Sequence, residues 1–174
     1  MRKSFGLCVI LLVSAASFAL AQDVTGFWKT IDDETGRAKS VVALYVYQGR
    51  LYGRVIMSYE PDGVTVRDDI YRQQRRSPFL VGEPAFCGLD IMWELGERGG
   101  RWRDGSIMDP GDQEKKPKVY GAEVWRQGVD LTVRGKIAIF GRNQTWKRFA
   151  PSDFPPSVRA PDTSTFRPVI PQIK

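Results

Sequence analysis

The stretch Asp23-Val-Thr-Gly-Phe-Trp-Lys-Thr30 decides how the rest of the sequence is interpreted. Its Gly26 and Trp28 open a series of short alternating segments that ends at Gln144-Thr-Trp-Lys-Arg148. The 174 residues include five Trp, six Tyr and nine Phe, and aromatic residues favour pleated, half-buried surfaces. An opening Gly-x-Trp and a closing Trp-x-Arg predict one small sheet that wraps back on itself.

Short polar links rich in glycine separate most of the alternating segments, as in β-hairpins. Eight strands are predicted near 24–30, 38–47, 51–58, 87–95, 101–108, 118–126, 131–140 and 142–149. One helical turn is expected only within 66–76, because no segment has a sustained helical period with caps. Short antiparallel strands must hide their edges, so we expect an all-β, eight-stranded antiparallel up-and-down barrel, with a two-sheet sandwich as the alternative.

Alternation along two of these strands indicates which side chains face inward. In 87–95 the expected inner residues are Leu89, Ile91, Trp93 and Leu95, opposite Gly88, Asp90, Met92 and Glu94. In 131–140 the expected inner residues are Leu131, Val133, Ile137 and Ile139. The segment 41–47 is apolar on both faces, so another segment or another subunit should cover its outer side.

The first 21 residues have the features of a secretory signal. Arg2 and Lys3 precede a mainly apolar segment, and Ala19-Leu20-Ala21 offers a cleavage site, so the mature chain is expected to begin at Gln22. Cleavage would leave 24 basic and 20 acidic residues, with no segment long enough to span a membrane. We expect a periplasmic or secreted protein with a signal peptide (1–21), one barrel domain (22–149) and a C-terminal tail (150–174).

The tail 150–174 holds six of the 11 prolines of the chain and almost no alternating pattern. Such a segment favours extended, polyproline-like conformations. It is therefore expected either to be disordered or to dock Phe154 or Phe166 on the outer apolar face of the strand at 41–47. An envelope protein is the partner that we expect such a tail to contact.

The absence of histidine excludes Ser-His-Asp and Cys-His catalysis and histidine-ligated metal sites. Acidic groups occur at 32–34, 68–69 and 109–114, but none has the spacing of an EF-hand loop, and each is expected in a solvated turn. The basic run 72–76 suits either phosphate groups or a solvated loop partly neutralised by Asp68 and Asp69. We predict no catalytic residue, no metal, no cofactor and no nucleic-acid partner.

Cys87 is the only cysteine after the signal segment, so the mature chain cannot form an internal disulfide. A lone cysteine in an oxidising compartment is buried, paired with another chain or reactive. Burial is the expected state, because free cysteine is among the most buried residue types.

Several motifs, in this order, resemble the exported bacterial family of unknown function numbered 2147. They are Gly26-Phe-Trp28, Asp33-Glu-Thr-Gly36, Leu51-Tyr-Gly-Arg54, Cys87-Gly-Leu89, Trp102-Arg-Asp-Gly-Ser-Ile-Met-Asp-Pro110, Leu131-Thr-Val-Arg-Gly135 and Gln144-Thr-Trp-Lys-Arg148. The resemblance covers nearly all of the expected domain and implies a lipocalin-like (calycin-like) barrel without an established activity. The connection from Asp109 to Tyr120 departs from the family pattern, being longer and highly charged.

The resemblance also implies a contact between the two ends of the barrel sequence. In lipocalin-type barrels a Trp on the first strand packs against a basic side chain near the end of the last. Trp28 and Arg148 are the corresponding residues here, and a cation over an aromatic ring is worth roughly 0.5 to 2 kcal/mol.

The aromatic residues can form a core or line a pocket, and small barrels usually fill their own interior. If a pocket exists, its expected walls are Trp28, Trp93, Trp102, Tyr120, Trp146 and Arg148. The leading functional hypothesis is an exported protein that binds a small apolar, amphiphilic or anionic lipid-like ligand, or an envelope component. The alternative is a non-catalytic structural or protein-interaction module of the envelope.

Overall fold

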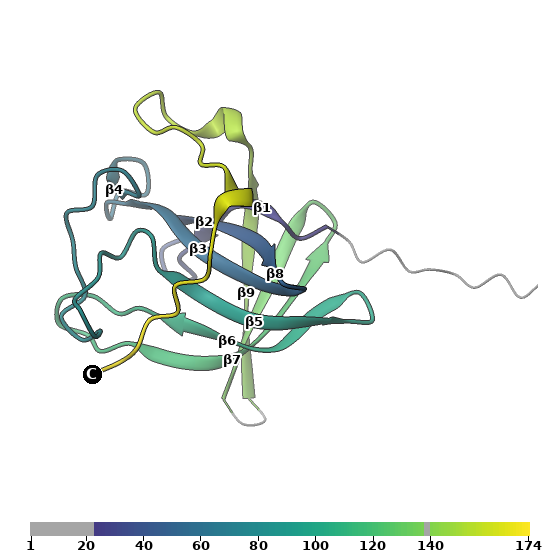
Figure 1. The fold of residues 1–174 in the computed structure, drawn as a ribbon. Helices are drawn as coiled ribbons and strands as arrows, with labels where there is room; N and C mark the ends of the chain where they lie inside the picture. Colours follow the sequence, from purple (N-terminus) through teal and green to yellow (C-terminus); the bar gives the residue numbers. More distant parts are fainter. Residues whose placement is uncertain (1–22, 138–139) are drawn as a thin grey trace, which may run out of the picture.

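The computed structural model describes residues 23–137 and 140–174, which form nine strands and two short 3-10 helices (Figure 1). The strands are β1 (Gly26–Ile31), β2 (Ala38–Tyr47), β3 (Arg50–Tyr59), β4 (Val66–Asp69), β5 (Asp90–Arg98), β6 (Arg101–Asp109), β7 (Lys118–Gln127), β8 (Asp130–Ile137) and β9 (Phe140–Phe149). The helices η1 (Pro151–Asp153) and η2 (Thr163–Thr165) both lie in the tail. The expected signal peptide and Ile139 lie outside the described residues.

Eight of the strands close into an antiparallel barrel. Around it, each strand pairs with its neighbour in the order β1, β2, β3, β5, β6, β7, β8 and β9. The last strand then pairs with the first, with Trp28 opposite Arg148. Every strand of the barrel therefore has a partner on both edges, which confirms the predicted barrel over the sandwich.

One end of the barrel is closed by tight turns and by the Trp28 ring. The turns that lie at this end are 48–49, 99–100 and 128–129. Trp28 is fully buried, and its Nε1 donates a hydrogen bond of 2.8 Å to the carbonyl of Val24. The guanidinium of Arg148 lies 5.1 Å from the ring centroid, as the family resemblance implied, and that of Arg126 lies at 5.0 Å.

Gly26 allows Arg148 to reach this position. Its φ of 104° is unfavourable for residues with a side chain, and a Cβ there would lie 3.1 Å from the Nη2 of Arg148. The guanidinium crosses the glycine and donates to the carbonyl of Thr25 at 3.0 Å. The opening Gly-x-Trp is thus needed to build the closed end of the barrel.

The inner face of β5 differs from the simple alternation expected for it. Met92, expected outside, is fully buried in the barrel interior with Leu95. The pairing of β3 with β5 shifts register next to Gly53, and Glu94 has a φ of +61°. An irregularity of this kind changes which residues face inward, so strict alternation fails between Met92 and Leu95.

The connection after β3 contains the strand β4, so the helical turn expected within 66–76 is wrong. Asp68 and Asp69, expected in a solvated turn, are buried at 2% and 1% exposure. The carboxylate of Asp69 accepts from the backbone N–H groups of Tyr71 and Arg72. These side-chain bonds satisfy the backbone without a helix.

The tail 150–174 is docked on the outside of the barrel (Figure 1). Of the two arrangements expected for the tail, disordered or docked, the docked one is confirmed. Phe154 packs edge-on against Phe27 and Phe149, with ring centroids 5.0 and 4.9 Å away. Val41 and Ala43, on the outer face of β2, belong to the same cluster and are fully buried. The two-faced apolar strand is therefore covered by the chain's own tail.

Candidate functional site

A cavity of about 890 Å³ opens at the end of the barrel opposite Trp28. The connections around it are the β1–β2 link, the long β3–β5 link and the β6–β7 link, which are longer than the turns of the closed end. Its volume lies within the range of roughly 300 to 1,000 Å³ that small-molecule sites occupy. The open end of the barrel is thus the candidate binding site.

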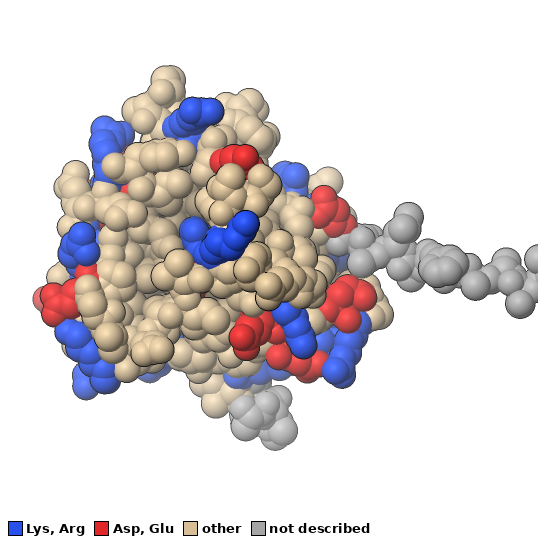
Figure 2. All heavy atoms as spheres, viewed as in Figure 1, with Lys and Arg blue, Asp and Glu red and all other residues tan. Residues whose placement is uncertain are grey.

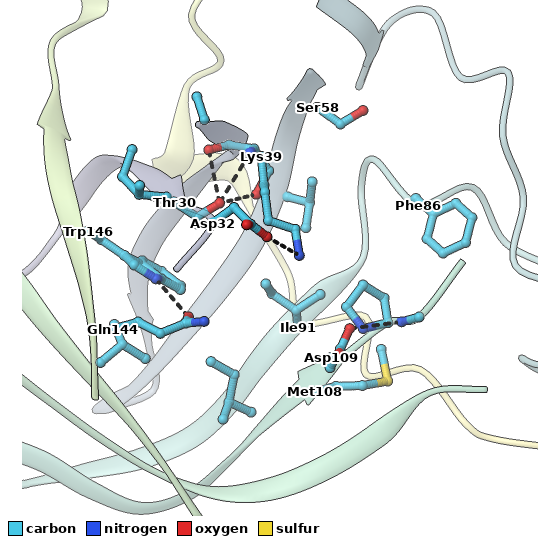
Figure 3. A pocket seen from close by; sticks show the side chains of 18 of the residues that line it. Thr30, Asp32, Lys39, Ser58, Phe86, Ile91, Met108, Asp109, Gln144 and Trp146 are labelled. Atoms are coloured by element: carbon cyan, nitrogen blue, oxygen red, sulfur yellow. Dashed lines mark hydrogen bonds and ion pairs between the residues drawn. The ribbon is translucent and has the colours of Figure 1, made fainter. Parts of the chain in front are cut away.

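The deep part of the cavity is apolar. Its apolar lining includes Val55, Ile91, Ile107, Met108, Val133 and Trp146. Val133 and Trp146 are each 1% exposed, so they form a packed floor rather than a loose surface. In Figure 3, Trp146 and Gln144 lie on one side of the cavity and Phe86 and Met108 on the other. A ligand here would exchange water for hydrocarbon and aromatic contacts.

Polar groups line the wall above this floor. The hydroxyl groups of Thr30 and Ser40 lie 2.8 Å apart and bond to one another. The amide of Gln144 accepts from Trp146 Nε1 at 3.4 Å and donates to Asp33 Oδ2 at 3.3 Å. These groups are positioned by β1, β2 and β9, and they provide donors and acceptors without an acid–base pair.

Arg75 supplies a positive charge in the opposite wall. Its Nε donates to the buried carboxylate of Asp68 at 3.1 Å, and its guanidinium lies 5.3 Å from the Phe86 ring centroid. The expected neutralisation of the basic run by Asp68 is therefore correct, although the carboxylate is buried. The pair holds Arg75 in one orientation beside the cavity.

Ion pairs surround the mouth of the cavity. Lys39 Nζ lies 3.6 Å from Asp32 Oδ2, and Arg142 Nη2 lies 3.0 Å from Asp33 Oδ2. The backbone N–H of Thr35 donates to the Asp32 carboxylate and lowers its pKa. Exposed pairs of this kind contribute little stability, so their partners are free to rearrange around a polar group.

Only two of the six candidate residues from the sequence line this cavity. They are Trp146, on the floor, and Tyr120, on the wall. Trp28 and Arg148 lie at the closed end, while Trp93 and Trp102 are half-buried and pack against the interior cluster. The prediction that the aromatic residues form a core therefore holds for the closed half of the barrel, and the prediction that they line a pocket holds for the open half.

Sequence reasoning missed Arg75, Phe86 and Met108 as cavity residues. The first two belong to the β3–β5 connection, whose path over the barrel has no periodic signal. Ile137, expected inside, lies at the mouth and is 63% exposed. The charged connection that departs from the family pattern also lines the mouth of the cavity, through residues 109–112.

Cys87 is buried and free, as expected. Burial raises the pKa of its thiol to about 12, and the thiol donates to the hydroxyl of Ser58, 4.0 Å from the sulfur. Since the thiolate is the reactive form, the thiol is held in its unreactive state at neutral pH.

Within residues 23–137 and 140–174, no group of three or more His, Cys, Asp or Glu residues is arranged to hold a metal ion. The same residues contain no helix with the length and apolar character needed to cross a bilayer.

Comparisons with known proteins give one family match and one similar solved structure. The family described as "Uncharacterized protein conserved in bacteria (DUF2147)" matches residues 26–148. A solved structure described as protein HP1028 from Helicobacter pylori, which "belongs to the lipocalin family", is similar, with a TM-score of 0.57 and 18% identity. The similarity covers 75% of this chain and 86% of that one. No curated protein matches the chain. At this identity the structural likeness establishes a lipocalin-like fold.

Proposed function

The chain belongs to the DUF2147 family, and we propose that it binds a small apolar or amphiphilic molecule inside its barrel. The observation that carries this proposal is the cavity of about 890 Å³ with a packed apolar floor at the open end of the barrel. An eight-stranded barrel has room for one small ligand when its interior is not filled by side chains. The lipocalin-like fold supports the proposal, because the interior of an eight-stranded barrel can hold one small ligand.

The lining favours a ligand with an apolar body and one polar end. The body would contact Val133, Ile107 and Trp146, and the polar end would lie toward Tyr120, Gln144 or Arg75. A lipid-like anion suits this arrangement, since the Arg75 guanidinium is already oriented by Asp68 and needs little reorganisation to donate a hydrogen bond to an anionic group. We propose no catalytic step, because the polar lining lacks an activated nucleophile and a paired general base.

We place the mature protein in the periplasm on the basis of its N-terminal sequence. The intact mass of protein recovered from a periplasmic extract tests this placement. A chain that begins at Gln22 is the expected result, and a chain that keeps residues 1–21 would contradict it.

The first test of binding is native mass spectrometry of the protein purified from its own envelope, beside a denatured control. A reproducible additional mass that disappears on denaturation is the expected result and would give the ligand's mass. Because ligands can be lost during purification, a second measurement uses the fluorescent amphiphile anilinonaphthalene sulfonate as a probe.

The matched variants for the probe experiment are Gly135→Leu and Gly121→Leu. Gly135 lines the cavity, and a Cβ there would meet its nearest neighbour at 3.7 Å, so a larger side chain would project into the empty space. Gly121 lies on the adjacent strand β7, is exposed and does not line the cavity. We expect Gly135→Leu to weaken probe binding at least tenfold and Gly121→Leu to leave it unchanged. Equal binding by both variants, with no native ligand mass, would reject the proposal.

A further inference from the structure

A second binding arrangement lies on the outside of the barrel, where β2, β3 and β5 hold part of the tail. Asp90, at the start of β5, is fully buried beneath the tail. Its Oδ1 accepts from the hydroxyl of Tyr45 at 3.0 Å and from Nε of Arg54 at 3.1 Å. Its Oδ2 accepts from Nη2 of Arg54 at 2.8 Å and from the backbone N–H of Val169 at 2.6 Å. One carboxylate thus joins two barrel strands to the tail.

The same network satisfies the tail's main chain on both sides of a proline. Nη2 of Arg54 donates to the carbonyl of Arg167 at 2.5 Å, and Asp90 accepts from the N–H of Val169. Pro168, between them, has no N–H that needs a partner. The barrel side chains therefore bind the extended main chain on either side of a proline. These hydrogen bonds do not depend on the exposed side chains of the tail.

Aromatic side chains complete the contact. The Arg54 guanidinium lies 4.5 Å from the Phe166 ring centroid, and the same ring meets Tyr45 edge-on at 5.3 Å. The guanidinium of Arg167 lies 5.4 Å from the Tyr47 ring centroid. Grooves that bind proline-rich segments use the same elements, namely aromatic walls and polar groups that bind an extended main chain.

The receiving side chains are positioned by the barrel itself. Arg54 and Asp90 are register partners on β3 and β5, and Tyr45 lies on β2. All three fall within the residues that the family match covers, whereas the tail lies beyond them. The network can therefore form from the barrel strands alone, which makes it a preformed site with the tail as its occupant.

The occupying segment is only partly buried. Val169 is 56% exposed and Ile170 is 40% exposed. In Figure 2, which shows the face that the tail crosses, most charged side chains lie around the edge, and a basic group lies near the middle. A few main-chain and ring contacts thus hold the segment, and such an arrangement suits a ligand that can exchange.

We propose that the outer face of β2, β3 and β5 is a peptide-recognition site for extended segments of the pattern aromatic–x–Pro–x. In this chain residues 166–169 fill it. A segment of the same pattern in a partner protein would compete with them, which would make the tail an internal competitor. This binding surface is separate from the cavity, so it does not depend on the ligand proposed above.

A cleavable tail tests whether the site binds a segment that is not covalently attached. A protease recognition sequence inserted between Ala160 and Pro161 lets the full chain fold before residues 161–174 are cut free. Uncut, the tail competes at an effective concentration of about millimolar, which would hide binding of a free peptide. After the cut, size-exclusion chromatography at micromolar concentration should show the fragment still bound. Loss of the fragment while the barrel keeps its circular dichroism would overturn the proposal.

Peptide variants then test the pattern without changing the folded protein. A fluorescent peptide of residues 161–174 should replace the cut fragment, as measured by anisotropy. The change Phe166→Ala in the peptide should weaken binding about tenfold, because it removes the ring from Arg54 and Tyr45. Gln172→Ala, at an exposed side chain, is the matched control and should bind as the original peptide does. Equal binding of both variants would reject the pattern.

The uncut protein provides the last comparison. A monomer is expected, because each chain fills its own site. A dimer that the free peptide dissociates would show that the competing segment is the tail of a second copy, and it would overturn the assignment to a partner of different sequence.

Discussion

The closed and open ends of this barrel are built from the same strands but differ in the size of their inward side chains. Along β8 the inward residues are Leu131, Val133 and Gly135, in order toward the open end. The same decrease occurs along β2, from Leu44 through Val42 to Ser40. The inward side chains on these two strands become smaller toward the open end, and the cavity occupies the space that this leaves.

This difference shows how one small fold combines stability with a binding space. The closed end buries the Trp28 ring and large aliphatic groups such as Leu44 and Leu51, and their burial contributes hydrophobic stabilisation. The open end has small inward residues at Ser40 and Gly135 above its apolar floor, and these leave room for a ligand. Substitutions at matched positions of the two ends should therefore have opposite consequences.

The largest expected effect is that of Trp28→Ala at the closed end. The ring is fully buried and lies beside two guanidinium groups, so its removal should lower the free energy of unfolding by about 3–5 kcal/mol. Urea denaturation measures the change. Trp125→Ala, at a half-buried ring, is the control and should cost much less. If both variants lose the same free energy of unfolding, the closed end has no special role in stability.

Gly53→Ala should have the next largest effect. A Cβ at Gly53 would lie 2.9 Å from Cδ2 of Leu44 and 3.0 Å from Cβ of Met92, within the filled half of the barrel. Overpacking of this kind costs about 1–3 kcal/mol, measurable by the same denaturation experiment. An unchanged midpoint would mean that the closed end has unfilled space.

Gly135→Ala is the matched change at the open end, and it should have a small effect of opposite sign. Its Cβ would meet Tyr120 and Ile107 at ordinary distances of 3.7 and 3.9 Å. Alanine is favoured over glycine within a strand by roughly 0.5–1 kcal/mol, so the variant should be slightly more stable. A loss as large as that of Gly53→Ala would contradict the assignment of empty space to this end.

The sequence predicted the barrel well because its signals are local. Alternation and glycine-rich turns located all eight barrel strands, and the motifs at Trp28 and Arg148 anticipated the contact at the closed end. The failures have long-range causes. The register shift beside Gly53 moved Met92 inward, and the carboxylates of Asp68 and Asp69 organise a connection that lacks any periodic pattern.

The candidate site was harder to predict for a related reason. Aromatic residues mark cores and pockets equally, so the choice of Trp28 and Trp146 could not separate the two ends. The better signal was the decrease in inward side-chain size along β2 and β8, which can be read only once the register is known. Arg75 and Phe86 reach the cavity from a connection whose course depends on tertiary contacts.

The smallest expected effect concerns Cys87, next to Phe86 in the wall of the open end. Because burial raises its pKa to about 12, the native thiol should not react with a disulfide reagent at pH 8, whereas it should react at once in denaturant. Ser164→Cys places a thiol at an exposed position and provides the positive control. Rapid labelling of native Cys87 would show that the wall of the open end opens frequently.

The same thiol also predicts how stability depends on pH. Between pH 9, near the ordinary pKa, and about pH 12, the folded state keeps a proton that the unfolded state releases. The contribution of Cys87 is therefore fully present below pH 9 and is lost as the pH rises through this interval. Denaturation midpoints of the native chain and of Cys87→Ala should converge as the pH is raised from 8 to 10. If the difference stays constant, the thiol has the same pKa in the folded and unfolded states, and water reaches Cys87 in the wall of the open end.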